Sequence, residues 1–518
     1  MAQEISQKSK RVARNTLLLY FRMLLLMFIG LFTSRVVLRT LGVDDFGTYN
    51  VVYSIVMMFS VLSNSISSSI QRFLAFELGK GDEIRMKKVF SSALLIQCGL
   101  VAILFCLAET LGVWYLENKA AIPVGREHAA MWAFQSCTLL LAIQLFSIPF
   151  NSAIIVHEDM KAFAWISLLE GALKLCVAIT LYFATIDKLI LYSVLMVCVA
   201  AINRGAYAYF CHRHYKETKS GPRYDRESLK AMLSLGAWSF TAYGVGVFNT
   251  QGVNILSNSV FGVRINAARG VAGQIENIVK QFVNNFLTAL TPLIVKTWAE
   301  NDREYCFALV RKGCKYSYLI VLLFALPFIF GADTLLTLWL GEVPDHAVVF
   351  TQLAVLTVMA DMMSNSLAQL ILAEGKVSIY YLVTSSISAL TFIGVWIAFS
   401  LGAGPESAYV IAIVILITIS VARLFFANRL CGFPIGAFLK EVAGPLLVTT
   451  LLPLSFTLIP RFFWPGDGLW KALVCILCSV VTVCILAYAI ALTPGEKSYI
   501  RSLCESRIMT KVQIDDEN

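Results

Sequence analysis

Apolar stretches of about 20 residues follow one another along this 518-residue chain, each long enough to cross a membrane as a helix. Lipid offers no partners for backbone N–H and C=O groups, so such stretches must bond internally as helices. The predicted spans are 15–38, 46–76, 89–114, 129–153, 162–184, 189–210, 232–260, 270–295, 316–340, 348–372, 378–401, 407–428, 442–460 and 470–492. The pattern predicts an all-α polytopic membrane protein with about 14 transmembrane helices.

The composition agrees with this fold class. Hydrophobic residues make up 58% of the chain, charged residues only 14%, and the mean hydropathy is +0.73. A soluble domain is nearer one-quarter charged, and it has nowhere to hide so much apolar surface. The composition therefore excludes a water-soluble globular protein.

The net charge of +9 is distributed unevenly between the loops. If the N-terminus is cytoplasmic, the inside segments hold most of the lysines and arginines, with a dense group in the loop around 211–231. The outside segments hold only Arg39, Lys119, Arg126, Lys188, Arg264, Arg269 and Arg461. By the positive-inside rule this predicts that both termini are cytoplasmic, and it explains the charge without nucleic acid. The basic start also lacks the features of a cleavable signal peptide.

The chain repeats itself with a nearly constant offset. Leu41-Gly42-Val43 resembles Phe261-Gly262-Val263 (262 − 42 = 220), and Asp82 corresponds to Asp302 (302 − 82 = 220). The repeat contains six spans, so both copies have the same topology and predict two pseudo-symmetric six-helix lobes facing a midplane cleft. The predicted divisions are a basic N-terminus (1–14), an N-lobe (15–212), a linker (213–231), a C-lobe (232–430), two extra C-terminal helices (431–492) and a cytoplasmic tail (493–518).

Several charged residues fall inside the predicted spans, where each costs roughly 2.5–3.5 kcal/mol unless it faces a partner or water. Glu170 and Lys174 are spaced i,i+4, and we interpret them as a self-neutralising pair. The eighth span differs because Glu276 and Lys280 lie beside a continuous polar face, which predicts a water-lined cavity. The alternative for such faces is hydrogen bonding between packed helices.

The candidate site follows from these residues. The predicted substrate-binding cations are Arg22, Arg35, Arg72, Lys280, Arg264 and Arg269. The predicted polar lining is Asn64, Gln71, Asn254, Gln274, Glu276, Asn277, Gln281 and Asn284, and Glu276 and Asp361 are candidates for ion coupling. Arginine binds phosphate in bidentate fashion, so the set suits an anionic, hydroxyl-rich substrate. For Arg22 and Arg72 the alternative is snorkelling to the inner interface.

Signatures of catalysis are not found in the sequence. There is no P-loop and no H-E-x-x-H motif, so we expect neither an enzyme nor a cofactor. Cys475 and Cys478 form a CxxC inside an apolar span and are interpreted as structural, so no metal site is expected. No outside loop is long enough to fold alone, which argues against a membrane polymerase or ligase.

The run from Thr33 to Tyr49, with Arg35, Leu41-Gly42, Phe46-Gly47 and Tyr49, resembles the start of the polysaccharide-transporter family of O-antigen and capsule flippases. Gln71-Arg72-Phe73 and Gly81-Asp82 are similar to that family as well. The family belongs to a superfamily that also contains multidrug exporters. The resemblance implies a MATE-like fold of two six-helix lobes, and it implies that Arg35 and Arg22 are cavity cations.

The resemblance also implies the function. Such a protein moves undecaprenyl-pyrophosphate-linked oligosaccharide across the bacterial inner membrane by alternating access, for O-antigen, capsule or exopolysaccharide synthesis. We expect a monomer whose partners are membrane lipid, this substrate and polysaccharide polymerase machinery. The alternative is a cation-coupled multidrug or metabolite antiporter of the same superfamily, which would need a coupling carboxylate such as Glu276 or Asp361.

Overall fold

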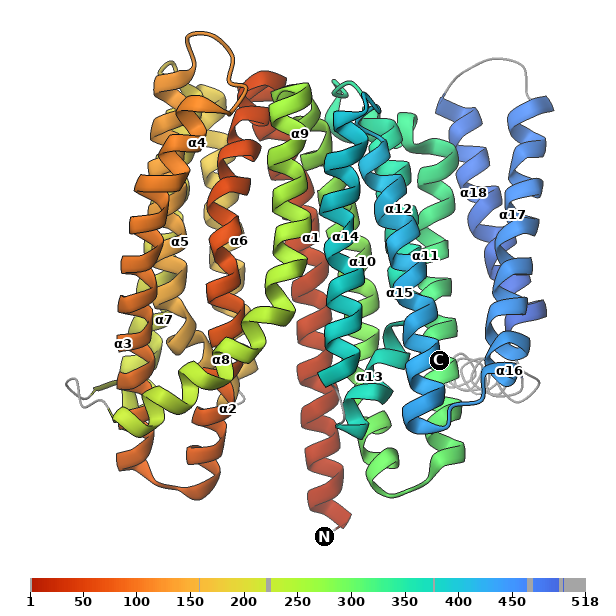
Figure 1. The fold of residues 1–518 in the computed structure, drawn as a ribbon, viewed down its shortest axis with the longest axis horizontal. Helices are drawn as coiled ribbons and strands as arrows, with labels where there is room; N and C mark the ends of the chain where they lie inside the picture. Colours follow the sequence, from red (N-terminus) through yellow and green to blue (C-terminus); the bar gives the residue numbers. More distant parts are fainter. Residues whose placement is uncertain are drawn as a thin grey trace, which may run out of the picture. The chain divides into compact units, whose positions relative to one another are not determined.

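The computed structural model describes residues 2–157, 159–219, 225–375, 378–463, 469–492 and 497. These residues form helices joined by short turns, with no strand in the part of the chain described (Figure 1). The predicted all-α membrane fold is confirmed. The side chain of Asn64, the linker residues 220–224 and nearly all of the tail 493–518 lie outside the described part.

The helices of the first repeat copy alternate with tight turns. In order they are α1 (Ala2–Met57), η1 (Met58–Ser60), α2 (Val61–Lys80), α3 (Glu83–Leu107), η2 (Ala108–Gly112), α4 (Val113–Asn118), α5 (Glu127–Val156), α6 (Met160–Phe183), α7 (Lys188–His214) and η3 (Lys216–Lys219). Asp82 caps α3 by accepting bonds from the backbone N–H groups of Ile84 and Arg85. Asp187 caps α7 in the same way, so carboxylates define where these helices begin.

The second copy and the C-terminal helices follow the linker. They are α8 (Arg226–Val247), η4 (Phe248–Gly252), α9 (Val253–Phe261), α10 (Val263–Ala299), α11 (Arg303–Leu340), α12 (Ala347–Met362), α13 (Asn365–Glu374), α14 (Ser378–Ser400), α15 (Ser407–Cys431), α16 (Ile435–Phe438), η5 (Leu439–Ala443), α17 (Gly444–Phe463), α18 (Leu469–Leu486) and η6 (Ala487–Ala491). The chain forms two compact units. Unit 1 contains Met1–Val271, Thr337–Ala347 and Ser388–Ala408, and unit 2 contains the remainder.

Eleven helices in the described part are long and apolar enough to cross a membrane, judged by length and composition. Three of the predicted spans, the second, seventh and eighth, are not counted separately among these eleven. In the structure they are nevertheless helical, as α2, α8–α9 and α10. These are the three spans in which the sequence places polar faces. Each also contains residues whose side chains lie outside the described part of the chain.

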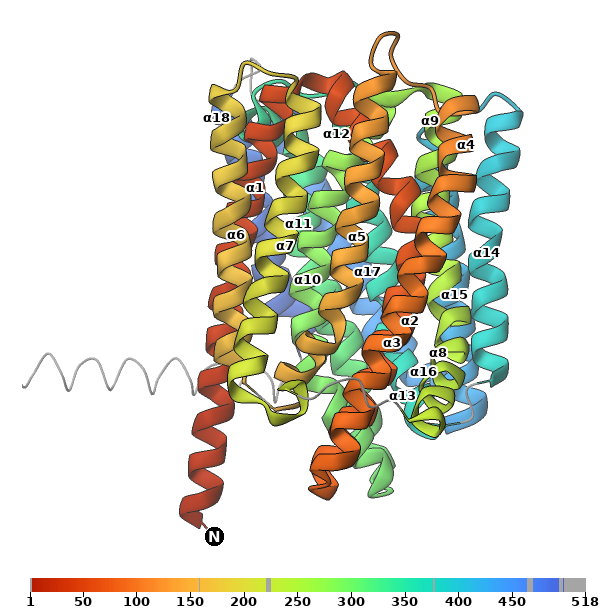
Figure 2. The same ribbon diagram turned by 90° about the vertical axis from the view of Figure 1, so that its left-hand side faces the viewer.

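Within unit 1, the long helices pack side by side. Helix α5 lies against α7, α1 against α6, and α8 beside α2 and α3 (Figures 1 and 2). At the face that carries Gly42, the Arg126 guanidinium bonds both Asp45 and Asp187, with shortest N···O distances of 2.6 Å to each. This arrangement ties together the helix ends that begin α5 and α7. The hydrogen bonds from Arg126 lower the pKa of the Asp187 carboxyl below its ordinary value.

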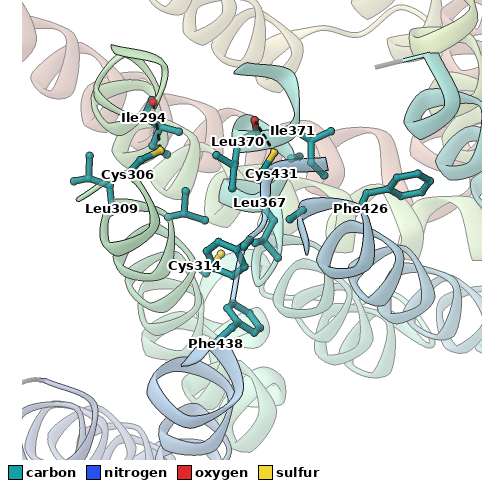
Figure 3. Packing of buried hydrophobic residues seen from close by; sticks show 14 of the residues in the cluster. Ile294, Cys306, Leu309, Cys314, Leu367, Leu370, Ile371, Phe426, Cys431 and Phe438 are labelled. Carbon is teal, nitrogen blue, oxygen red and sulfur yellow. Dashed lines mark hydrogen bonds between the residues drawn. The ribbon is translucent and has the colours of Figure 1, made fainter. Parts of the chain in front are cut away.

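Unit 2 is held by an apolar cluster that links α10, α11, α13, α15 and the start of the C-terminal helices (Figure 3). Cys306, Cys314 and Cys431 are buried in it as free thiols. The Cys306 thiol donates to the Ile294 carbonyl and the Cys431 thiol to the Leu370 carbonyl, so these cysteines act as packing residues. Helices α17 and α18 pack on each other, and Tyr318 on α11 bonds Thr450 on α17 at 3.0 Å.

The two copies of the sequence repeat also have equivalent helix starts and backbone dihedral angles in the structure. Helices α3 and α11 begin at 83 and 303, and α5 and α12 begin at 127 and 347, an offset of 220 in both cases (303 − 83; 347 − 127). Gly42 and Gly262 have nearly the same dihedrals, φ 78°, ψ 171° and φ 82°, ψ −177°. These angles strain a residue with a Cβ, so glycine is needed at both positions. At the next equivalent turn, Gly81 (φ 72°) corresponds to Asn301 (φ 61°).

Candidate functional site

Helix α10 presents two chemically different faces within unit 2. Ile275, Val279 and Val283 are buried on one face, with exposures of 5% or less. The predicted polar lining occupies the other face, where Gln274 is half-buried and Asn277, Gln281 and Asn284 are exposed. Large amides are costly against lipid, so the accessible face of α10 is suited to water or to a polar ligand.

Four charged side chains gather beside this face. The Lys280 ammonium donates to Glu276 Oε1 at 2.7 Å, and Asp361 on α12 lies within electrostatic range of Lys280. Arg423 on α15 approaches Asp361 Oδ1 at 3.6 Å, a looser contact. Two acids and two bases give a cluster with no net charge, drawn from three helices of unit 2. We call these four residues the charge cluster.

The helix that carries Asp361 is interrupted beside the charge cluster. Helix α12 ends at Met362 and α13 begins at Asn365, so the predicted tenth span is broken inside its length. The break frees carbonyl groups, and side chains of α15 occupy them: Ser420 Oγ donates to the Ala360 carbonyl at 3.1 Å. Arg423 donates to the buried hydroxyl of Ser364 at 2.9 Å. Broken helices with engaged backbone groups are a common feature of transporter binding sites.

The charge cluster lies at a similar depth on each of its helices. At 1.5 Å per residue, Lys280 is about 26 Å from the start of α10, Asp361 about 21 Å from the start of α12, and Arg423 about 24 Å from the start of α15. In the predicted topology, these three helices all begin on the outside. The charges therefore occupy the interior of the predicted spans and not their ends.

In unit 1, equivalent positions of the two repeat copies touch each other. Arg264 donates to Asp44 at 2.8 Å, and these residues are 220 positions apart. A Cβ added to Gly270 would lie 2.9 Å from the Asn50 side chain, again 220 positions away (270 − 50). A residue contacts its own equivalent only near the axis that relates the copies. The segments that follow Gly42 and Gly262 therefore cross at that axis.

Close to this crossing, a small polar network holds α9 and α10. Arg269 Nε donates to Asn254 Oδ1 at 2.7 Å, and the Asn254 amide donates to Ser54 Oγ at 3.3 Å. The Asn266 amide bonds the Asn254 carbonyl at 2.8 Å. Arg269 and Asn254, both predicted site residues, are thus brought together. Here Asn254 serves as a connector between helices.

The remaining predicted cations of unit 1 differ in burial and in their partners. Arg22 donates to Ser167 Oγ at 3.1 Å and stacks over Phe163 at 4.5 Å, so it is engaged with α6. Arg35 is exposed and donates to the Leu338 carbonyl at 3.2 Å. Arg72 is exposed in the middle of α2, and Gln71 is half-buried on the same helix. Unit 1 therefore does not collect these arginines at one point.

Two features of the site went unrecognised in the sequence. The partnership of Asp361 with Arg423 joins residues 62 positions apart, for which no local pattern exists. The break after α12 has a faint signal, the polar run Ser364-Asn365-Ser366 inside an apolar span. The Asp44–Arg264 contact could have been predicted from the repeat, since opposite charges occupy equivalent positions.

Among the described residues, no group of three or more His, Cys, Asp or Glu side chains is arranged to hold a metal.

Comparison with known proteins gives one family match. The profile described as polysaccharide biosynthesis protein matches residues 12–298, more than half of the chain. Among curated proteins, the chain is similar to the uncharacterized membrane protein EpsK of Bacillus subtilis (strain 168), with 20% identity over 326 residues. The match covers 61% of this chain and spans 63% of the length of that relative.

Solved structures share the fold. The lipid II flippase MurJ, in an inward closed conformation, matches with TM-score 0.63 and 14% identity, covering 92% of this chain and 98% of that one. An inward-facing multidrug resistance MATE family transporter of the MOP superfamily matches with TM-score 0.61 and 13% identity, covering 79% and 95%. At these identities the likeness establishes a transporter fold and leaves the substrate to be argued from the site.

Proposed function

We propose that this chain, which belongs to the polysaccharide biosynthesis protein family, is a flippase for polyprenyl-pyrophosphate-linked oligosaccharide in the bacterial inner membrane. The family match is the observation that carries the proposal, because it joins a membrane transporter fold to polysaccharide synthesis. Under the predicted orientation, the face that carries Gly42 is periplasmic and both termini are cytoplasmic.

The side chains of the site support an anionic, hydroxyl-rich substrate. In unit 2, the Lys280 ammonium beside the polar face of α10 suits phosphate oxygens. The accessible amides of α10 suit sugar hydroxyls, since an amide both donates and accepts hydrogen bonds. Flipping requires no covalent step, so these residues need only bind the headgroup and shield it from lipid while the polyprenyl tail stays in the bilayer.

The proposal is tested by purified protein in liposomes that contain a fluorescent polyprenyl-pyrophosphate oligosaccharide in both leaflets. A membrane-impermeant reagent that destroys the outer-leaflet sugar should remove about half of the signal from protein-free vesicles, and more from vesicles with active protein. An equal loss with and without protein would refute flipping of this substrate. In cells, deletion of the gene should leave lipid-linked oligosaccharide on the cytoplasmic leaflet.

The alternative is a cation-coupled multidrug or metabolite antiporter, which the MATE neighbours keep open as a candidate. Such a protein would use a carboxylate that releases its cation or proton during transport. In unit 2, Glu276 is bonded to Lys280 and Asp361 faces Arg423, so a coupling carboxylate there would exchange its basic partner for the cation or proton. Drug sensitivity that rises on gene deletion, with normal flipping, would favour the antiporter.

A further inference from the structure

Arg423 and Lys280 carry cationic groups whose present partners come from inside the protein. We propose that the two side chains form an anion subsite within unit 2, in which Asp361 and Glu276 act as displaceable counter-ions for the substrate pyrophosphate. This inference rests on the proposed function, because it assigns one part of that substrate to a place in the structure.

The first support is that Arg423 is only partly satisfied. Its Nη1 atom reaches the Ser364 hydroxyl at 2.9 Å, but the Asp361 carboxylate at only 3.6 Å and the Asp361 carbonyl at 3.5 Å. Its Nε atom is buried and makes no hydrogen bond in the described structure. A guanidinium that satisfied a carboxylate would make two parallel bonds of about 2.7–2.9 Å. Arg423 thus keeps donor capacity for a second oxyanion.

The second support is the position of the cluster at the helix break. Ser420 from α15 donates to the Ala360 carbonyl at 3.1 Å, so this carbonyl is not available to a cation cage, and the Arg423 guanidinium lies 3.5 Å from the Asp361 carbonyl. The donors that remain near Asp361 are the ammonium of Lys280 and the guanidinium of Arg423. The chemistry at the break therefore favours an anion over a metal cation.

The third support is accessibility. The side chains of Glu276, Lys280, Asp361 and Arg423 keep exposures of 24%, 32%, 23% and 17%. The Glu170–Lys174 pair of unit 1 is also accessible, at 34% and 40%, so access permits binding here and the incomplete bonding of Arg423 distinguishes the charge cluster. Partial access lets a phosphate group approach both cations without unfolding their surroundings.

Charge balance gives the subsite a distinctive property. The cluster is neutral, so an arriving phosphate leaves excess negative charge unless a carboxylate takes up a proton. Besides Glu276 and Asp361, the buried thiol of Cys314 on α11 lies within electrostatic range of Arg423. Anion binding should therefore be accompanied by proton uptake, which couples substrate binding to the proton without a metal or nucleotide.

The experiment measures binding of farnesyl pyrophosphate, with farnesol as the neutral control, to the full-length protein in lipid nanodiscs. Calorimetry in two buffers of different ionisation enthalpy at one pH reports the protons taken up. We expect wild type to bind the pyrophosphate with uptake of about one proton. Arg423→Gln and Lys280→Gln should each weaken binding about tenfold, the equivalent of a lost charged hydrogen bond.

Three further variants keep the test decisive. Asp361→Asn removes a counter-ion and keeps both cations, so affinity should rise and proton uptake should fall. Lys174→Gln removes the basic partner of the matched pair in unit 1 and should leave binding unchanged. If Arg423→Gln fails to fold, Arg423→Lys retains the charge without the bidentate fork and should give intermediate binding.

The subsite is overturned if farnesol binds as well as the pyrophosphate, or if neither Asp361→Asn nor the Arg423 variants change affinity. The proposed function is judged separately by the liposome flipping assay. Wild-type flipping with unaltered flipping by Arg423→Gln would retain the function and reject the subsite. No flipping by wild type would reject the function itself, even where farnesyl pyrophosphate binds.

Discussion

Two pairs of residues with the same spacing in the sequence have different surroundings in the structure. Glu170 and Lys174 in unit 1 and Glu276 and Lys280 in unit 2 are both i,i+4 pairs with the acid first, at 2.6 Å and 2.7 Å. The unit 1 pair gains a neutral partner, because Asn203 donates to Glu170 Oε2 at 2.9 Å. The unit 2 pair lies near a second acid, Asp361, which in turn faces Arg423.

The comparison teaches that the role of an intramembrane ion pair depends on which further side chains surround the two charged groups. A pair whose only further partner is a neutral amide has its two charges balanced, so it helps the helix to insert into lipid and to pack. A pair within reach of further charges can exchange partners, which is what a binding site requires. The pairs at the helix ends differ in the same way. Arg126 in the first copy bonds two carboxylates, Asp45 and Asp187, whereas the corresponding His346 in the second copy is paired with Glu406.

The largest expected difference is between the two lysines. Lys280→Gln should lower flipping about tenfold or more, because a cation that contacts the substrate is lost. Lys174→Gln should stay within about twofold of wild type, since Asn203 still bonds Glu170. The measurement is the initial flipping rate per inserted protein. Equal losses in the two variants would abolish the distinction between the pairs.

The helix-end pairs should differ in stability. Arg126→Ala leaves Asp45 and Asp187 without their shared partner, with an expected loss of about 1–3 kcal/mol in the free energy of unfolding. His346→Ala removes a more exposed partner of Glu406 and should cost about 0–1 kcal/mol. Thermal unfolding in detergent compares the two. A larger loss of stability for His346→Ala than for Arg126→Ala would contradict the greater stabilising role expected of Arg126.

The same helix ends predict a dependence on acid. Because Arg126 lowers the folded-state pKa of Asp187, this carboxylate stabilises the fold above its unfolded pKa of about 3.9. The contribution is lost as the pH falls through the folded value. Asp187→Asn should therefore be less stable than wild type at pH 7 and approach wild type in strong acid. Parallel pH curves for the two proteins would contradict this.

The smallest effect is expected at the contact between equivalent positions. Arg264 and Asp44 are well exposed, with side-chain exposures of 66% and 49%, so their ion pair contributes little to stability. Asp44→Asn should leave the thermal midpoint unchanged within error. A clear fall would show that the crossing of the two copies depends on this charge and not on the glycine-mediated close approach.

The sequence by itself determined the fold class, the approximate places of the spans and the repeat. These features are local, because each span must be apolar enough to enter lipid and must bond its own backbone, and duplicated glycines preserve the turns at Gly42 and Gly262. The polar face of α10 was likewise visible as a periodic pattern, and the structure keeps it accessible.

Only the tertiary structure decided which charges meet. Arg22 is engaged with α6, Arg269 holds Asn254, and Arg423 on α15 faces Asp361 beside the break between α12 and α13. Residues far apart in the chain become partners through the packing of whole helices, and periodicity within one helix carries no information about that. The physical reason is that hydropathy is summed along a segment, whereas the energy of a buried charge is set by its nearest few ångströms.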